Sequence, residues 1–242
     1  MQSEHMGQAD VMGSLLVLGD SLAFHGPDRP YPPHDDRLFP QVAARNLGVS
    51  VDLLARPGWT ARDAWWALTK DPVAWGQYLP RAKYVLVAVG GMDALPAAVP
   101  TWLRESIGYV RSGPIRRRVR GLLAGVTPGI IQVTGGRFRQ LPQQVTDHYL
   151  TRIVQGVRTW RPDVPIGVLT PAPYRSGLYP SQRPHSPAVS ATYAWAQALG
   201  VAVIDIDRLD VASDEANPDG LHWSWAMHEW VGLAVAEGMR NR

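Results

Sequence analysis

Leu15-Leu16-Val17-Leu18 is the first apolar run of the chain, and it leads directly into the polar turn Gly19-Asp20-Ser21-Leu22. Consecutive apolar residues without alternation are typical of a strand that is buried on both faces of a parallel sheet. In sheets of this kind, ligands and reactive groups lie at the carboxyl ends of the strands. We therefore expect Ser21 to stand at an edge of the sheet where chemistry takes place.

The rest of the chain alternates between short apolar runs and helical patterns. The expected strands cover residues 14–18, 49–54, 84–89, 166–169 and 201–206. The expected helices cover residues 39–47, 61–68, 99–109, 145–160, 187–199 and 224–239, with Thr60 as an N-cap and Gly48 and Gly200 at helix ends. This alternation predicts an α/β fold, a three-layer α/β/α sandwich around a five-stranded, mainly parallel sheet.

Length and patterning indicate how the chain is divided. Its 242 residues suffice for one sizeable hydrophobic core but are few for two ordinary domains. We expect a flexible N-terminal extension over residues 1–12 and a single catalytic domain over residues 13–242. The segment 112–142 is basic, rich in glycine and without a clean period. It predicts an insertion or lid around residues 111–142, with a disordered excursion as the alternative.

Composition excludes several classes of protein. Hydrophobic residues make up 45% of the chain, which is typical of a globular protein. No apolar stretch approaches the roughly 18 residues of a membrane span, and the polar N-terminus lacks the layout of an export signal. The absence of cysteine excludes disulfides, thiolate metal sites and a cysteine nucleophile. These features favour a cytoplasmic protein.

Positive charge is concentrated in one stretch, although the formal net charge is only +3. Between residues 104 and 139 a single acid, Glu105, is accompanied by the arginines Arg104, Arg111, Arg116, Arg117, Arg118, Arg120, Arg137 and Arg139. The stretch predicts a basic surface for an anionic partner, or alternatively a solvated arginine face. It lacks interleaved aromatic residues, so we do not expect a nucleic acid as partner.

We expect neither a metal site nor a cofactor. His34, Asp35 and Asp36 are metal-ligating residue types, but they are consecutive in the sequence, so their side chains diverge. The chain contains no phosphate-cradling Gly-Lys-Ser/Thr loop and no dinucleotide-binding fingerprint.

The residue types of nucleophilic acyl chemistry occur in the order Ser21, Asp219, His222. A serine hydroxyl is a poor nucleophile at neutral pH, and a neutral imidazole within hydrogen-bond reach can take its proton during attack. The imidazolium that forms needs a carboxylate to hold its tautomer and its charge. Asp219 and His222 can be presented by one loop. Ser21 is expected at the entry to a helix, where the positive helix end favours developing negative charge.

Four short blocks follow expected strands or stand near the C-terminus. They are Gly19-Asp20-Ser21-Leu22, Arg56-Pro57-Gly58-Trp59-Thr60, Gly90-Gly91-Met92-Asp93 and Asp219-Gly220-Leu221-His222-Trp223. In order, spacing and placement these blocks resemble the SGNH, or GDSL, family of serine hydrolases and acyltransferases, and the resemblance covers nearly the whole chain. It implies a flavodoxin-like order of strands.

The resemblance also implies a role for individual residues. Ser21 is the expected nucleophile, His222 the general base and Asp219 its orienting partner, while the backbone N–H groups of Ser21 and Gly58 are expected to donate to the oxyanion. The family has a third donor, an Asn, where this chain has Met92, whose side chain has no N–H group. Losing one oxyanion donor typically costs about 10²–10³ in rate.

The same resemblance implies an acyl group carried on Ser21, which either water or a sugar hydroxyl could accept. Arg116 and Arg117 could bind the phosphates of an acyl-CoA donor, and Trp59 and Met92 could line an acyl or sugar pocket. The resemblance, and not composition or spacing, implies an acyltransferase that takes a medium-chain acyl-CoA, octanoyl-CoA, as donor substrate and a glucosylated glycerate as acceptor. The alternatives are an esterase, thioesterase or sugar-ester deacylase of the family, and a non-catalytic sugar- or lipid-binding module.

Other polar residues near these blocks are expected to support the structure. Asp20 and Asp93 should bond to backbone groups of their own turns. For His25 the sequence favours a surface or capping role over a place in the pocket, and His228 is expected to be peripheral on the final helix.

Overall fold

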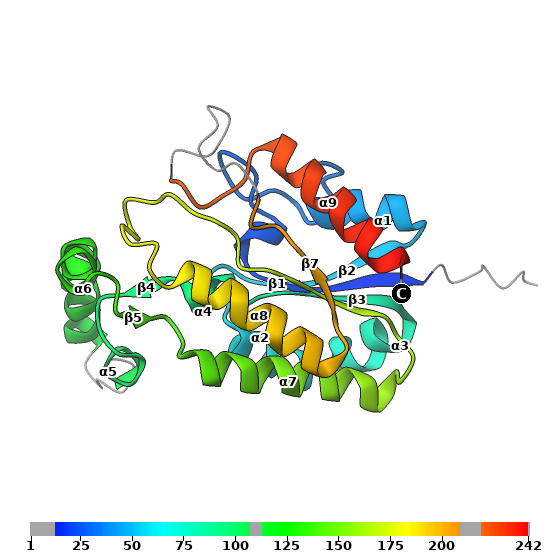
Figure 1. Cartoon of the computed structure of the whole chain (residues 1–242), viewed down its shortest axis with the longest axis horizontal. Helices are drawn as coiled ribbons and strands as arrows, with labels where there is room; N and C mark the ends of the chain where they lie inside the picture. The colour runs from blue at the N-terminus through cyan, green and yellow to red at the C-terminus, as the bar shows by residue number, and fades with distance from the viewer. Residues whose placement is uncertain (1–12, 107–112, 209–218, 242) are drawn as a thin grey trace, which may run out of the picture.

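The computed structural model describes residues 13–106, 113–208 and 219–241, and a parallel sheet lies at its centre (Figure 1). The sheet has five strands in the order β2-β1-β3-β6-β7. They are β1 (Ser14–Gly19), β2 (Ser50–Ala55), β3 (Ala82–Ala88), β6 (Ile166–Leu169) and β7 (Ala202–Ile204). The N-terminal extension expected over residues 1–12 lies outside the described residues.

Strand β1 is buried on both faces, as its continuous apolar run predicts. It pairs in parallel with β2 on one side and with β3 on the other. Leu15 and Val17 belong to one hydrophobic cluster, and Leu16 and Leu18 belong to a second cluster on the opposite face. The alternation of side chains along a strand therefore divides one short segment between two cores.

Helices cover both faces of the sheet and confirm the three-layer α/β/α fold (Figure 1). Helices α1 (Phe39–Leu47) and α9 (Trp225–Arg240) pack on the face of Leu15 and Val17. Helices α2 (Ala61–Lys70), α7 (Gln143–Trp160) and α8 (His185–Leu199) cover the face of Leu16 and Leu18. No helix in the described part of the chain is long and apolar enough to cross a membrane.

The predicted helix ends are confirmed at three positions. Thr60 caps α2 through a reciprocal capping box with Asp63. Gly48 and Gly200 end α1 and α8 in the left-handed conformation that glycine adopts without penalty.

Several short elements were not expected from the sequence. They are the 3₁₀ turn η1 (Ser21–Ala23), the π-helical turn η2 (Ala74–Tyr78), α3 (Leu79–Arg81), α4 (Gly91–Ala94), and the antiparallel pair β4 (Pro96–Ala97) and β5 (Phe138–Arg139). Helix α5 (Thr101–Ser106) occupies part of the expected helix 99–109, whose last residues are outside the description.

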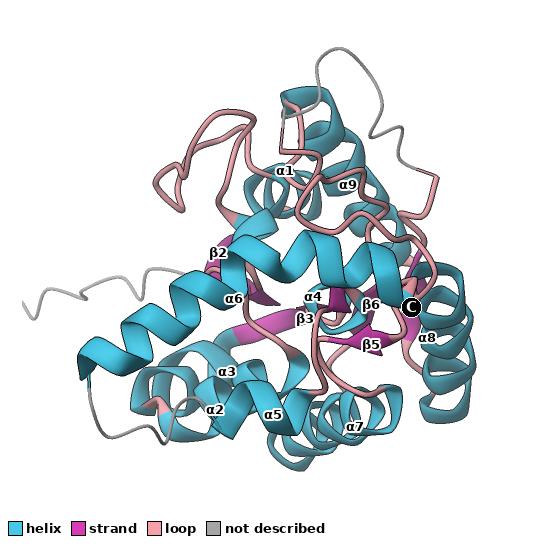
Figure 2. Ribbon diagram, turned by 90° about the vertical axis from the view of Figure 1, so that its left-hand side faces the viewer, coloured by secondary structure: helices cyan, strands magenta, loops and turns pink. Residues whose placement is uncertain are grey.

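The segment without a clean period contains a helix, α6 (Gly113–Thr134), so for these residues the alternative of a disordered excursion is wrong. Two exposed glycines, Gly125 and Gly129, and an internal proline, Pro128, obscure the helical pattern in the sequence. Helices α5 and α6 and the β4–β5 pair lie at the end of the molecule where the strands terminate (Figures 1 and 2). That these residues form an insertion or a lid stays a prediction.

The order of the strands creates a crevice at this same end. From β1 the chain first adds β2 on one side and then β3 on the other, so the direction of winding reverses between β1 and β3. In open α/β sheets, ligands bind outside the carboxyl ends of the strands at such a switch point. Ser21 follows β1 and Met92 follows β3, so both stand at this crevice.

Candidate active site

Ser21 lies in the turn that follows the central strand. Asp20 caps this turn, because its Oδ1 accepts a hydrogen bond of 2.9 Å from the N–H of Leu22. The turn is only the 3₁₀ segment Ser21–Ala23 and is not the start of a helix. The expectation that Ser21 feels a helix dipole is therefore wrong, since one 3₁₀ turn aligns too few peptide units.

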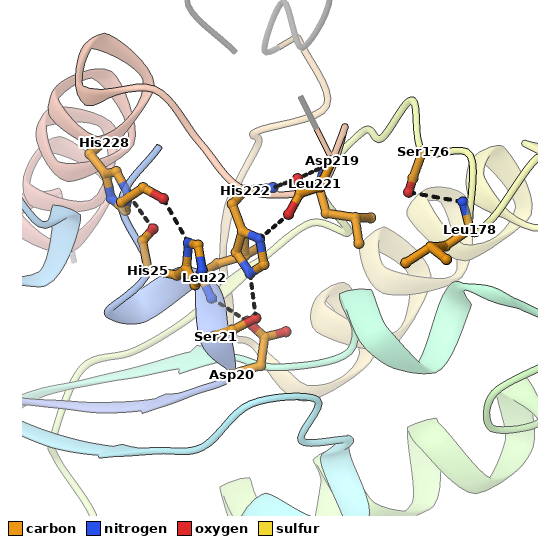
Figure 3. A network of polar contacts seen from close by, with 11 residues as sticks. Asp20, Ser21, Leu22, His25, Ser176, Leu178, Asp219, Leu221, His222 and His228 are labelled. Carbon is orange, nitrogen blue, oxygen red and sulfur yellow. Dashed lines mark hydrogen bonds and ion pairs between the residues drawn. The ribbon is translucent and has the colours of Figure 1, made fainter. Parts of the chain in front are cut away.

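Ser21, His222 and Asp219 lie in a hydrogen-bonded row (Figure 3). His222 Nε2 is 3.0 Å from Ser21 Oγ, although the two residues are 201 positions apart in the sequence. His222 Nδ1 is 2.6 Å from Asp219 Oδ2. This geometry leaves Nε2 of a neutral imidazole as the acceptor for the serine proton, with the carboxylate holding the tautomer.

The loop that carries Asp219 and His222 is fixed by its own backbone. Asp219 Oδ1 accepts hydrogen bonds from the N–H groups of Leu221 and His222, at 2.8 and 3.0 Å. The Gly220 carbonyl accepts a 2.8 Å bond from the N–H of Arg175, which ties the loop to the segment after β6. Gly220 has φ +67°, and an added Cβ would lie 1.8 Å from the Arg175 oxygen. Only glycine fits this close approach.

His25 contacts the candidate base directly, so the expectation of a surface or capping role is wrong. Its ring stacks on that of His222 with centroids 3.6 Å apart and planes inclined by 19°. His25 Nδ1 lies 2.7 Å from the Gly26 carbonyl, so this nitrogen carries the proton and donates. Only the spacing of four residues between Ser21 and His25 hinted at this contact.

His228 is fully buried on α9, so the expectation that it is peripheral is also wrong. The N–H of Phe39 donates to His228 Nδ1 at 3.2 Å. His228 Nε2 donates to the His25 carbonyl at 3.0 Å (Figure 3). Both ring nitrogens are therefore satisfied by a neutral imidazole. Burial lowers the pKa of His228 to about 4, which keeps it neutral at physiological pH.

The electrostatics of the row favour a neutral base and a charged acid. Burial lowers the pKa of His222, the Asp219 carboxylate opposes this, and the neighbouring His25 adds to the lowering, so that the pKa lies below its usual value. Burial raises the pKa of Asp219, but hydrogen bonds from His222 and Leu221 outweigh it and leave the pKa below its usual value. Asp219 is therefore ionised while His222 is free to accept a proton.

Two further carboxyl groups are buried behind the site. Burial raises the pKa of Asp20 to about 7, and the nearby Asp93 contributes to this rise. Burial likewise raises the pKa of Asp93 to about 6. Asp20 braces its own turn as expected, whereas Asp93 accepts hydrogen bonds from the Ala61 N–H and the Thr146 hydroxyl and so joins its loop to α2 and α7.

Gly58 and Met92 lie together near Ser21. Gly58 has φ +71°, and an added Cβ would lie 4.0 Å from Met92 Cε. Among the described residues, the backbone N–H groups of Ser21 and Gly58 have no hydrogen-bond acceptor. Neither amide is engaged by another described residue, and Met92, which stands at the sequence position of the family's third donor, has its methyl group next to Gly58.

A narrow, mainly apolar cavity of about 60 Å³ opens beside Ser21 and His222. It lies at the β1–β3 switch point. Its walls are Asp20, Leu22, Gly91, Met92, Leu95, Ala172, Pro173, Tyr174 and Leu221. The sequence reasoning found Met92 but missed the wall formed by residues 172–174, which follow β6 at the same edge of the sheet.

Trp59, another expected substrate contact, does not line this cavity. It lies in a separate hollow beside Arg56. Arg116 and Arg117 are part of α6, but their side chains are outside what the structure describes.

No group of three or more metal-ligating side chains occurs within residues 13–106, 113–208 and 219–241. Asp35, from the sequence cluster His34-Asp35-Asp36, accepts two hydrogen bonds from the Arg37 guanidinium instead. Its carboxylate thus already has a cationic partner.

A flavodoxin-like sheet with a Ser–His–Asp row at its switch point defines a serine hydrolase or acyltransferase. The sequence matches the GDSL-like Lipase/Acylhydrolase family over residues 17–230, and the chain belongs to this family. It is therefore an enzyme.

Two proteins with an assigned activity are similar in sequence to this chain over almost their whole length. The diglucosylglycerate octanoyltransferase of Mycolicibacterium hassiacum is 38% identical over 230 residues, which cover 93% of this chain and 92% of that protein. The Mycobacterium tuberculosis protein of the same name is also 38% identical, over 93% of this chain and 90% of its own.

Solved structures of the family share the fold at low identity. A lipase/acylhydrolase from Enterococcus faecalis superposes with a TM-score of 0.63 at 16% identity, covering 96% of this chain and 97% of that one. Est24, a carbohydrate acetylesterase from Sinorhizobium meliloti, gives a TM-score of 0.62 at 16% identity, covering 95% and 99%.

Replacing Gly220 should disturb the acid and the base together. In Gly220→Ala, the clash with Arg175 displaces the loop, and a displacement of about 1 Å at reacting groups can lower kcat/KM about 10²-fold. Ester hydrolysis or acyl transfer per folded molecule is the measurement. Gly200→Ala is the matched control, because Gly200 has φ +62° with no atom within 4 Å of an added Cβ. It should cost about 1–2 kcal/mol of stability and leave activity intact. Equal activity of both variants would contradict the assigned role of the loop.

Proposed function

We propose that the protein is a serine acyltransferase that moves a medium-chain acyl group, octanoyl, from octanoyl-CoA through an acyl-enzyme on Ser21 to a hydroxyl of a glucosylglycerate-type sugar. The hydrogen-bonded row Ser21–His222–Asp219 is the observation that carries the proposal. The relatives named diglucosylglycerate octanoyltransferase support the acyl group and the acceptor.

In the first step, Ser21 Oγ attacks the thioester carbonyl while His222 Nε2 takes the serine proton. Asp219 stabilises the imidazolium, and the N–H groups of Ser21 and Gly58 bind the oxyanion. The C–S bond then breaks, the sulfur takes the proton from His222, and free CoA leaves. The octanoyl group is now an ester on Ser21.

In the second step a sugar hydroxyl takes the place of the serine. Its proton passes to His222 Nε2 as its oxygen attacks the acyl carbonyl. When the bond to Ser21 Oγ breaks, His222 returns the proton to the serine, and the sugar ester leaves. Water attacking at the same point would give free octanoate, so hydrolysis is the competing outcome.

The small cavity limits what the acyl chain can do. About 60 Å³ lies beside Ser21, whereas an engineered cavity of about 150 Å³ is needed to hold one benzene ring. An eight-carbon chain therefore fits inside this cavity only if side chains move, and otherwise part of it must lie outside. Met92 is suited to such movement, because its unbranched thioether adapts to irregular spaces.

An esterase or sugar-ester deacylase is the second candidate function. The fold shared with lipases and esterases accommodates it, and the triad geometry is the same for both reactions. The two differ only in which hydroxyl deacylates Ser21. The alternative of a non-catalytic sugar- or lipid-binding module is wrong, because the chain is an enzyme of this family.

Exposure to octanoyl-CoA should leave an octanoyl group on Ser21. Intact mass spectrometry after rapid quenching should show the added acyl mass, and peptide mapping should place it on Ser21. Ser21→Ala should show no adduct and lose about 10³-fold or more in kcat. Adding diglucosylglycerate should discharge the adduct into a sugar ester. The protein would be a hydrolase instead if free octanoate formed at the same rate with and without sugar and no sugar ester appeared. Activity that survives in Ser21→Ala would contradict the role of Ser21 as nucleophile.

The pH dependence of kcat/KM should report His222. Only the neutral ring accepts a proton, so activity falls as the pH drops through the pKa of His222 in the free enzyme. Because burial and His25 place this pKa below the usual value of about 6.5, the acidic limb should have its midpoint below pH 6.5. A profile measured with octanoyl-CoA at subsaturating concentration checks this. A midpoint clearly above 6.5, with chemistry rate-limiting, would contradict the assignment.

Met92→Asn should shift the enzyme towards ordinary ester hydrolysis. The carboxamide N–H would supply a third oxyanion donor, and one such donor is worth up to about 10² in kcat with short acetyl esters. The polar group would also reduce octanoyl transfer by interrupting the apolar wall. Met92→Leu retains an apolar side chain without an N–H, so it should give no gain in hydrolysis. An equal gain in both variants would show that cavity shape, and not the missing donor, limits the reaction.

A further inference from the structure

A second, larger cavity of about 470 Å³ lies near the candidate active site and has no part in the mechanism above. Its size falls within the range of small-molecule sites, about 300–1,000 Å³. It is lined by Arg62, Pro100, Thr101, Trp102, Arg137, Phe138, Arg139, Leu141, Pro142 and Val145. These residues come from the start of α2, the start of α5, strand β5 with its flanking residues and the start of α7 (Figure 2).

Among the residues that the structure describes, the lining carries three positive charges and no negative one. Arg62, Arg137 and Arg139 are all lining residues, and no Asp or Glu is among them. Converging arginines are typical of sites for phosphate and carboxylate groups, because their planar guanidinium groups donate several hydrogen bonds at once. The cavity is therefore electrostatically prepared for an anion.

Arg139 has an incompletely satisfied charge at this site. Its Nε is buried and has no hydrogen-bond partner among the described residues, while one of its terminal nitrogens donates to Gln143 Oε1. Burial lowers the pKa of Arg139, and Asp93 and Asp147 offset this from outside the cavity lining. An anion in the cavity would compensate the desolvated charge directly.

The two cavities are separated by a single chain segment. Met92 and Leu95 line the cavity beside Ser21, and Asp93 lies between them in the sequence. Asp93 accepts a hydrogen bond from the N–H of Ala61, next to Arg62, and its carbonyl accepts one from the N–H of Leu141. Arg62 and Leu141 line the larger cavity, so the segment from Met92 to Leu95 borders both cavities.

Aromatic surface adjoins the arginines. Trp102 is 71% exposed at the cavity, and Phe138 is half-buried there. Three cations match a ligand with several phosphate charges better than one with a single carboxylate, and an exposed indole offers a face on which a purine base can stack. Of the substrates in the proposed reaction, only the thioester donor has both phosphates and a base.

We infer that this cavity binds the phosphate-bearing nucleotide part of the acyl-CoA donor, with Arg62, Arg137 and Arg139 on the phosphates and Trp102 against the base. The inference rests on the proposed function for the identity of the donor. The acyl end then reaches Ser21 past the segment that contains Met92. The arginines select thioesters of CoA over acyl groups on carriers without phosphates.

Binding is tested without catalysis by titrating the intact protein with CoA and with adenosine 3′,5′-bisphosphate in a calorimeter. Arg137→Glu and Trp102→Ala change exposed side chains, so both should fold. Each should weaken binding of both probes about tenfold or more, as expected for loss of a charge-assisted contact or a stacking contact. Arg45→Glu makes the same change of charge on α1, in the opposite layer, and should bind as the wild type does.

A kinetic comparison separates this inference from the proposed function. The donors are octanoyl-CoA and octanoyl-N-acetylcysteamine, which has the same thioester but no nucleotide. In Arg137→Glu, the ratio of kcat/KM for octanoyl-CoA to that for the short thioester should fall about tenfold or more.

An unchanged ratio with unchanged binding in both variants would overturn the inference while octanoyl transfer stands. An effect confined to the KM of the sugar acceptor would also overturn it, by assigning the cavity to the acceptor's carboxylate. Absence of octanoyl transfer from either donor in the wild type would refute the proposed function itself.

Discussion

The burial of strand β1 on both faces is the constraint on which the rest of the structure depends. Its side chains divide between two cores, and hydrogen bonds to β2 and β3 fix its backbone on both sides. A strand held in this way cannot shift or rotate without breaking both layers. The position of Ser21 is thus set by the whole molecule, and the loops after β3 and β6 are placed relative to it by the same sheet.

Around this fixed serine, histidine rings and buried carboxyl groups hold the adjoining segments in place. The neutral ring of His228 is hydrogen-bonded to the backbone of Phe39 and of His25, and the ring of His25 stacks on that of His222. Asp20 and Asp93 brace adjoining loops at the cost of burying acidic groups, which is visible in their raised pKa values. Such perturbed groups gather where a site needs rigid geometry and little water.

Local patterns in the sequence were enough to predict the layers and the row of three polar side chains. Strand β1, the capping box at Thr60 and the glycine ends at Gly48 and Gly200 depend on neighbours within a few residues, so periodicity reveals them. Ser21 and His222 were found because their motifs are short and their order is informative.

Features that depend on distant contacts could not be predicted in the same way. The stacking of His25 on His222 joins opposite ends of the chain, and the burial of His228 depends on how α9 packs against α1. Helix α6 was missed because Gly125, Pro128 and Gly129 weaken the local signal. Arg137 and Arg139 were recognised as basic, but Arg62 and Trp102 come from other elements and join them only in the folded chain.

The ring of His228 has a consequence for how the enzyme is made. It connects the start of α1 and the turn after Ser21 to a helix near the C-terminus, and the base itself precedes that helix by only a few residues. During synthesis on the ribosome, the serine emerges about two hundred residues before its partner. A partly translated chain therefore contains the serine without its histidine partner, and the hydrogen-bonded row can form only when the last helix has docked.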